Sequence, residues 1–297
     1  MRSSLITAVL LAALTAPVAH AAEDHSGHMH AAEGTGGALT QTRDERIPAG
    51  EEQAAVVLEK SPRHGEYVDI ALPGGGAPLR TWVVYPEKSG KAGVVLIIHE
   101  IFGLSPWIRA LADQLARDGY IAVAPDLVSG MGPGGGGTDS TRSRDELVGL
   151  IRALTPETTR TRLDAAMDWA IRQPSASGKV ATIGFCWGGS RSFEYAATQP
   201  ALKAAVVYYG ASPDSATLLM VKAPVLGHYG GDDARVNATI EPAARALKAR
   251  KRSYESHVYA GAGHGFLRQQ SGREGANLKA AQLSWPKTLS FLAKHLK

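Results

Sequence analysis

The segment that decides the fold is Val180-Ala181-Thr182-Ile183-Gly184-Phe185-Cys186-Trp187-Gly188-Gly189. Its first half is apolar and rich in β-branched residues, which is typical of a strand buried in a sheet. Its second half follows the pattern glycine–x–nucleophile–x–glycine, and a helical segment comes next. Flanking glycines let a strand turn sharply into a helix with the middle side chain at the tip. The pattern therefore predicts a strained elbow that presents the Cys186 thiol at a helix N-terminus.

Strand and helix signals alternate on both sides of this elbow. An antiparallel hairpin is expected first, followed by further buried strands, at Tyr67–Leu72, Leu79–Tyr85, Val94–Ile98, Tyr120–Ala124, Ala204–Tyr209, Pro224–Tyr229 and Glu255–Tyr259. Helices are expected at 105–119, 155–171, 190–198, 238–250 and 286–295, and the glycine-rich stretch 132–137 is expected to be a mobile surface loop. Such alternation predicts an α/β fold with a mostly parallel central sheet and helices on both faces.

The composition excludes several classes of protein. The chain has 297 residues, 44% of them hydrophobic and 20% charged, with a net charge of +4. Its basic residues are scattered rather than clustered, so we expect no nucleic-acid partner. Its single cysteine cannot form an internal disulfide, which leaves either a buried inert thiol or one kept for its chemistry.

The N-terminal part of the chain reads as an export signal and a leader. Residues 1–21 combine Arg2, an apolar core and a small-x-small cleavage site ending at Ala21, so we expect an exported protein, periplasmic or secreted. No later segment is apolar enough to span a membrane. Residues 22–60 read as a flexible leader rich in His, Gly and Ala, and residues 61–297 as the single α/β domain.

A candidate acid follows a later strand. The segment Gly230-Gly231-Asp232-Asp233-Ala234-Arg235-Val236 places two aspartates in the loop past the strand's carboxyl end. A carboxylate there can accept the N–H of a histidine and fix its tautomer. Either aspartate can serve, and the spacing to Val236 favours Asp233.

A candidate base follows the last predicted strand. His264 is bracketed by glycines in Ala260-Gly261-Ala262-Gly263-His264-Gly265-Phe266, a setting poorly suited to core packing and well suited to proton transfer. The order nucleophile, acid, histidine is that of α/β-hydrolases. The sequence therefore predicts an α/β-hydrolase with a triad of Cys186, Asp233 and His264, which needs no metal or organic cofactor.

The sequence also resembles the dienelactone hydrolase family, whose members are also called carboxymethylenebutenolidases. The resemblance runs from about residue 65 to 296. It is carried by the segments His99–Leu104, Ala124–Leu127, Gly184–Gly189, Tyr208–Gly210, Gly230–Asp233 and Ala262–Phe266. It implies hydrolysis of a lactone or ester bond in a small molecule. The substrate of the family itself also carries a carboxylate.

The resemblance implies further residue roles. Glu100 corresponds to a glutamate that helps to activate the thiol, and the backbone N–H groups of Ile101 and Trp187 to the oxyanion hole. Arg268 matches an arginine that binds the substrate carboxylate. The family uses a second arginine, but the glycine-rich insertion before Arg142 and Arg144 leaves that position unassigned.

Two alternatives to a lactone hydrolase remain. The first is a general exported esterase of the same fold with another substrate. The second is a non-catalytic metal-handling protein that uses His25, His28 and His30 of the leader.

Overall fold

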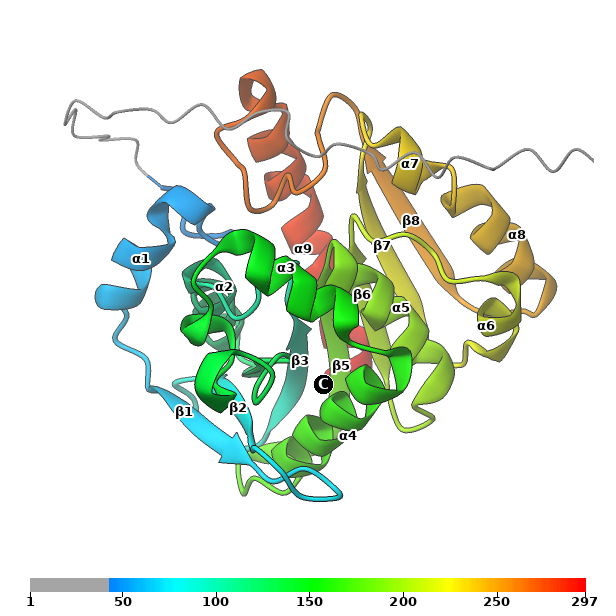
Figure 1. Ribbon diagram of the computed structural model, residues 1–297. Helices are drawn as coiled ribbons and strands as arrows, with labels where there is room; N and C mark the ends of the chain where they lie inside the picture. Colours follow the sequence, from blue (N-terminus) through cyan, green and yellow to red (C-terminus); the bar gives the residue numbers. More distant parts are fainter. Residues whose placement is uncertain (1–42) are drawn as a thin grey trace, which may run out of the picture. The chain divides into compact units, whose positions relative to one another are not determined.

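An eight-stranded sheet runs through the protein in the order β1-β2-β4-β3-β5-β6-β7-β8 (Figure 1). The structure, a computed structural model, describes residues 43–297. The strands are β1 (Gly65–Ile70), β2 (Leu79–Val84), β3 (Ala92–Ile98), β4 (Ile121–Pro125), β5 (Ala176–Phe185), β6 (Ala204–Tyr208), β7 (Val225–Gly230) and β8 (Tyr254–Tyr259). The β1–β2 and β2–β4 pairs are antiparallel, and all the other pairs are parallel.

Helices cover both faces of the sheet, so the predicted fold class is confirmed. They are α1 (Glu51–Glu59), α2 (Pro106–Arg117), α3 (Arg144–Ala153), α4 (Pro156–Ile171), α5 (Trp187–Thr198), α6 (Ser215–Met220), α7 (Ala234–Asn237), α8 (Ile240–Ala249) and α9 (Ala276–Leu296). Side chains of α1, α2 and α9 contribute to one apolar cluster, and those of α3 to α8 to the other.

The position of strand β3 explains why its sequence is apolar throughout. All seven of its residues are buried. Val94 and Leu96 belong to the cluster on one face, while Val95 and Ile97 belong to the cluster on the other. Successive side chains of a strand point to opposite faces, so a strand covered on both sides needs apolar residues at every position.

Two segments differ from the sequence-based expectations. The glycine-rich loop is held in place: the backbone N–H and hydroxyl of Thr138 donate to Asp126 at 2.7 and 2.8 Å, and the hydroxyl accepts from the Leu104 N–H at 3.0 Å. Helix α9 was expected to start at Pro286, since proline favours the first helical turn. It instead passes through Pro286, with Trp285 and Leu292 buried on either side of it.

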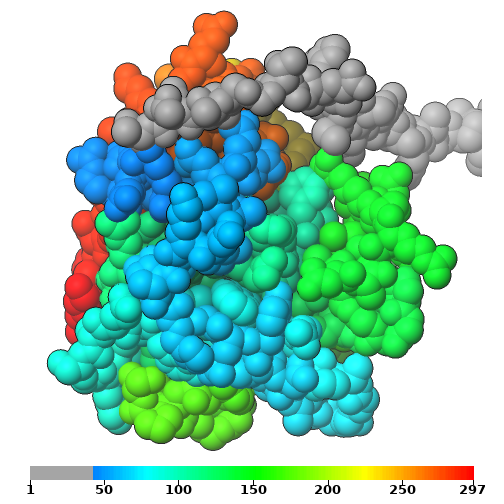
Figure 2. Space-filling view, turned by 90° about the vertical axis from the view of Figure 1, so that its left-hand side faces the viewer, coloured from blue at the N-terminus to red at the C-terminus, as the bar shows by residue number. Residues whose placement is uncertain are grey.

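The compact unit that the structure describes extends from Arg43 to Lys297, so it begins before the boundary predicted at residue 61. Residues 43–64, here called the N-terminal strap, include α1 and lie on the body of the domain (Figure 2). Ile47, Ala49 and Ala54 of the strap are buried. The sequence of 43–60 has no apolar periodicity, which is why this segment is predicted to belong to the leader. Polar contacts hold it on the domain in addition to the buried residues.

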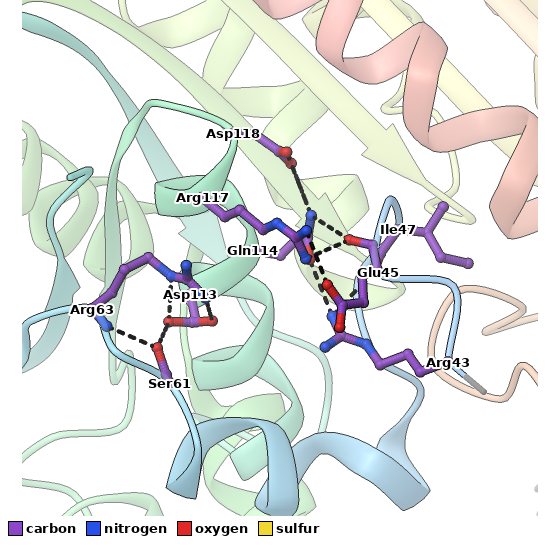
Figure 3. Close-up of polar contacts among 9 residues, drawn as sticks. All are labelled: Arg43, Glu45, Ile47, Ser61, Arg63, Asp113, Gln114, Arg117 and Asp118. Atoms are coloured by element: carbon purple, nitrogen blue, oxygen red, sulfur yellow. Dashed lines mark hydrogen bonds and ion pairs between the residues drawn. The ribbon is translucent and has the colours of Figure 1, made fainter. Parts of the chain in front are cut away.

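The two ends of the strap are bound to α2 (Figure 3). At one end, Arg43 donates to Gln114 at 3.1 Å, and Arg117 donates to the Glu45 carbonyl at 2.9 Å. At the other end, Arg63 donates two hydrogen bonds, of 2.9 and 2.7 Å, to the buried carboxylate of Asp113. Paired N–H···O bonds of this kind fix orientation as well as position.

The signal peptide predicted at 1–21 and His25, His28 and His30 lie outside the described residues. Within residues 43–297, the helices are all too short or too polar to cross a bilayer.

Candidate active site

Cys186 lies at the bend between β5 and α5. Its backbone adopts φ +54° and ψ −117°, a region that non-glycine residues rarely occupy, and holding it there costs about 1–3 kcal/mol. The surrounding structure fixes the bend, since the Cys186 N–H donates to the Tyr208 carbonyl at 3.0 Å and the Ser190 N–H donates to the Cys186 carbonyl at 3.2 Å. The predicted strained elbow is therefore present, with Trp187 as the first residue of α5.

The glycines of the elbow are required by close backbone contacts. A Cβ atom at Gly188 would overlap the carbonyl oxygens of Ile98 and His99 at the end of β3. A Cβ atom at Gly184 would overlap the carbonyl of Gly188. These contacts bring the first turn of α5 against the carboxyl end of β3, so that Cys186 and Glu100 come from adjacent strand ends.

His264 and Asp233 form a close pair beside the elbow. The His264 Nδ1 lies 2.5 Å from the Asp233 Oδ2, and the Asp233 side chain is only 8% exposed. Asp233 also caps the short helix α7 by accepting from the Val236 N–H at 3.4 Å. Asp232 instead pairs with Arg273 at 3.1 Å near the surface. Of the two candidate acids, the structure brings Asp233 to the histidine.

The electrostatics of His264 favour its charged form. Burial by itself lowers the pKa of His264, but hydrogen bonds with Asp233 and Cys186 and their negative charges outweigh it and raise the pKa to about 10. The imidazole therefore lies between a carboxylate on one side and the sulfur of Cys186 on the other. An imidazolium formed by proton transfer from the thiol would be stabilised from both sides.

Glu100 is buried at the end of β3 and faces Arg268. Its side chain is 3% exposed, and the Arg268 Nε lies 2.8 Å from its Oε2. Neither atom has a well-aligned hydrogen bond, so the contact is chiefly one of charge. Burial raises the pKa of Glu100 to about 7, even though the positive charges of Arg268 and His264 oppose this shift.

Arg268 contacts three groups at once. Besides Glu100, its guanidinium pairs with Glu51 of the N-terminal strap and lies 4.7 Å from the centroid of the Phe102 ring. The guanidinium of Arg144 lies 4.3 Å from the same ring. The structure therefore brings Arg144, rather than Arg142, to the neighbourhood of Arg268 through a shared aromatic ring.

The two predicted oxyanion-hole amides occupy suitable backbone positions. Ile101 follows Glu100 in the turn after β3, and Trp187 begins α5. The first N–H groups of a helix have no acceptor within the helix. The structure records no hydrogen-bond acceptor for either amide within residues 43–297. Both amides are thus available to an oxygen atom placed near Cys186.

Sequence reasoning missed two residues next to the site. Tyr209 is fully buried at φ +41°, and its ring centroid lies 5.2 Å from that of His264. His99 accepts from the Leu127 N–H through Nε2 at 3.1 Å, so its Nδ1 carries the proton and donates to the Glu100 carbonyl at 2.8 Å. Tyr208–Gly210 and His99–Leu104 were singled out as segments, but no pattern within them marks these side chains as neighbours of the site.

Metal binding has no support in the described part of the chain, residues 43–297. No group of three or more His, Cys, Asp or Glu side chains is arranged there to hold an ion.

Gly188→Ala should destabilise the protein by about 2–4 kcal/mol, because the new methyl group would overlap two backbone carbonyls that cannot move independently. The matched control is Gly149→Ala in α3, where the added Cβ meets no atom within 4 Å. That change should stabilise the protein by about 0.5–1 kcal/mol. Urea denaturation measures both values, and equal effects would contradict the close contact at Gly188.

Glu100 should make the free energy of unfolding depend on pH. Its pKa is raised from 4.5 to about 7, so its contribution to stability is fully present below pH 4.5 and is lost as the pH rises through 7. Relative to Glu100→Gln, the parent protein should lose about 1–3 kcal/mol over this range. Urea denaturation at several pH values tests this, with Glu59→Gln at an exposed position as control. Parallel profiles for the parent and Glu100→Gln would contradict the raised pKa.

Comparison with known proteins places this geometry in a family. The model of the dienelactone hydrolase family matches residues 79–296. A carboxymethylenebutenolidase of Pseudomonas putida is 34% identical over 211 residues, covering 70% of this chain and 88% of its own length. A Yersinia pestis protein that bears the same name provisionally is 33% identical over 239 residues, covering 76% of this chain and 88% of its own.

A solved structure gives the same result. The crystal structure of a provisionally named dienelactone hydrolase from Klebsiella pneumoniae superposes with a TM-score of 0.67 at 30% identity. The match covers 77% of this chain and 99% of the Klebsiella chain. The protein therefore belongs to the dienelactone hydrolase family of α/β-hydrolases, and it is a carboxylic ester hydrolase.

Proposed function

We propose that the protein hydrolyses a lactone or activated ester through a triad of Cys186, His264 and Asp233. The observation that carries the proposal is the elbow that presents Cys186 to a histidine whose Nδ1 is held by Asp233 at 2.5 Å. Because Nδ1 is engaged, Nε2 is the nitrogen left to exchange a proton with the sulfur. This arrangement supports covalent catalysis by the thiol.

The first half of the reaction forms a thioester. His264 holds the proton of the Cys186 thiol, and the resulting thiolate attacks the carbonyl carbon of the substrate. The carbonyl oxygen becomes an oxyanion, which accepts hydrogen bonds from the N–H groups of Ile101 and Trp187. His264 then gives its proton to the leaving oxygen as the carbon–oxygen bond breaks. In a lactone that oxygen stays attached to the same molecule.

The second half restores the enzyme. His264 removes a proton from a water molecule, whose oxygen attacks the thioester carbonyl. The tetrahedral adduct collapses, the carboxylic acid leaves, and the thiolate of Cys186 remains beside protonated His264. Asp233 keeps the imidazole oriented through both halves and stabilises the imidazolium formed in each.

Glu100 would stabilise the state in which His264 carries the proton of the Cys186 thiol. Ionised Glu100 and protonated His264 attract each other, and this attraction is one of the effects that oppose the raised pKa of Glu100. A negative charge at Glu100 therefore favours proton transfer from the thiol to the histidine. Arg268 and Arg144, both against Phe102, are the groups that would meet a carboxylate on the substrate.

A general esterase that acts on uncharged esters is the second candidate function. The observation in its favour is that the guanidinium of Arg268 already has two carboxylate partners, Glu51 and Glu100. A metal-handling role for His25, His28 and His30 concerns residues outside the described part, and no contact in residues 43–297 favours it.

Export is part of the proposal as well, on the strength of residues 1–21, which have the charged start, short apolar core and small-x-small ending of a cleaved signal. N-terminal sequencing of the protein from the periplasm or medium should then begin at Ala22. Recovery only of chains that begin at Met1 would contradict export.

Cys186→Ala should lower kcat/KM for 4-nitrophenyl acetate by about 10³-fold or more, because the thiol forms the covalent intermediate. Asp233→Asn should lower it by about 10²-fold or more, because the amide favours the wrong histidine tautomer. Asp232→Asn is the matched control, since Asp232 is the adjacent aspartate and pairs with Arg273 instead. Release of 4-nitrophenolate measures all three. A parent-like rate in Cys186→Ala would exclude the thiol mechanism.

A further inference from the structure

The N-terminal strap delivers a carboxylate to the arginine at the edge of the site. Glu51, the first residue of α1, pairs with Arg268 across 217 positions of sequence. The pair is reinforced by the backbone, because the Glu51 N–H donates to the Arg268 carbonyl at 2.9 Å. Glu51 lies before residue 79, where the match to the family model begins.

Two contacts around Glu51 hold the strap against the loop that carries Arg268, and a third holds it against α2. Gln270 donates to the Pro48 carbonyl at 2.8 Å, and Ser271 donates to Glu52 at 2.7 Å. Trp107 of α2 donates to the Ala49 carbonyl at 3.0 Å. Together with the two anchored ends in Figure 3, these contacts fix the position of Glu51 independently of its own side chain.

The two carboxylates on Arg268 differ in how easily they can be replaced. The Glu100 side chain is 3% exposed, whereas the Glu51 side chain is 43% exposed. The Arg268 side chain is 13% exposed. A substrate carboxylate that approaches from solvent therefore meets Glu51, and it would have to replace Glu51 to pair with Arg268.

Tethering makes Glu51 a strong competitor. A group held in place by its own chain acts at an effective concentration of about a millimolar or more. Its place in the first turn of α1 also favours its negative charge, because the N-terminal end of a helix is partly positive. A free substrate carboxylate at micromolar concentration would compete poorly with such a partner.

We propose that Glu51 is a specificity-determining residue, which occupies Arg268 in place of a substrate carboxylate and so sets the enzyme's preference toward uncharged esters. The proposal rests on the proposed hydrolysis of an ester bond through Cys186 and concerns only the choice of substrate. Glu51 acts on the binding of a remote carboxylate rather than on the carbonyl that reacts. Its effect should therefore appear mainly in KM for carboxylated substrates.

The test compares mono-4-nitrophenyl adipate, which carries a free carboxylate, with its methyl ester, which does not. The readout is the ratio of kcat/KM for the acid to kcat/KM for the methyl ester. Glu51→Gln and Glu51→Ala should each raise this ratio about two- to fivefold, the effect of a partly exposed ion pair. The rise should come from a lower KM for the acid.

Two further variants act as controls. Glu52→Gln removes the same charge one residue along α1 and should leave the ratio as it is, because Glu52 bonds to Ser271 and not to Arg268. In the background of Arg268→Ala, Glu51→Gln should no longer raise the ratio, since the partner is gone. Two different substitutions at Glu51 are used so that a loss of folding or activity in one variant does not decide the result. Both keep the backbone contact of Glu51.

The outcomes separate the two proposals. An unchanged or lower ratio in both Glu51 variants, with hydrolysis that still depends on Cys186, would overturn the role of Glu51 and leave the proposed function in place. An equal rise in Glu52→Gln would also overturn it, because the effect would then be one of net charge. Hydrolysis that persists at the parent rate in Cys186→Ala would overturn the proposed function, and the role of Glu51 with it.

Discussion

The first turn of α5 packs directly on the last carbonyls of β3, and the arrangement of the site depends on this contact. Gly188 lies against Ile98 and His99 with no room for a side chain. The helix that follows Cys186 is thereby fixed to the strand that precedes Glu100. Cys186 and Glu100, which are 86 positions apart in the sequence numbering, are thereby placed at the ends of two adjacent strands. Cys186 then has no freedom to relax from its positive φ, which keeps the sulfur at the tip of the bend.

Charge in the site is distributed so that no ionised group stands alone. Asp233 and Cys186 flank His264, and Arg268 lies against Glu100. Removing one member leaves the other buried and uncompensated, which costs more than the pair itself contributes. Glu100, whose pKa is near 7, can change charge at neutral pH.

Local motifs pointed to residues that the fold brings to one edge of the sheet, for a physical reason. Cys186, Asp233 and His264 each follow the carboxyl end of a parallel strand, and in such sheets these ends meet at one edge. The elbow also needs glycine at fixed positions, so its sequence reveals its geometry. The spacing to Val236 favours Asp233 over Asp232, and the coordinates give the two side chains different partners, His264 for Asp233 and Arg273 for Asp232.

The parts that sequence did not predict depend on long-range polar contacts. The strap has no regular apolar period, and pairs such as Arg63 with Asp113 help to set its place. The glycine-rich loop is held by Thr138 and Asp126 rather than by any regular pattern. Contacts of this kind leave no periodicity in the chain, so composition suggested flexibility in both places. Tyr209 escaped notice for a similar reason, since an aromatic residue after a buried strand is usually part of the core.

The strap also imposes an order on assembly. Residues 43–64 leave the ribosome among the first of the folded part, whereas the loop that carries Arg268, Gln270 and Ser271 is among the last. A polypeptide is made from its N-terminus, so Glu51 has no partner until nearly all of the chain has been synthesised. Contacts between such distant positions slow folding. The arginine at the edge of the site thus acquires its second carboxylate only at the end of synthesis, and nascent or C-terminally truncated chains would lack this part of the pocket.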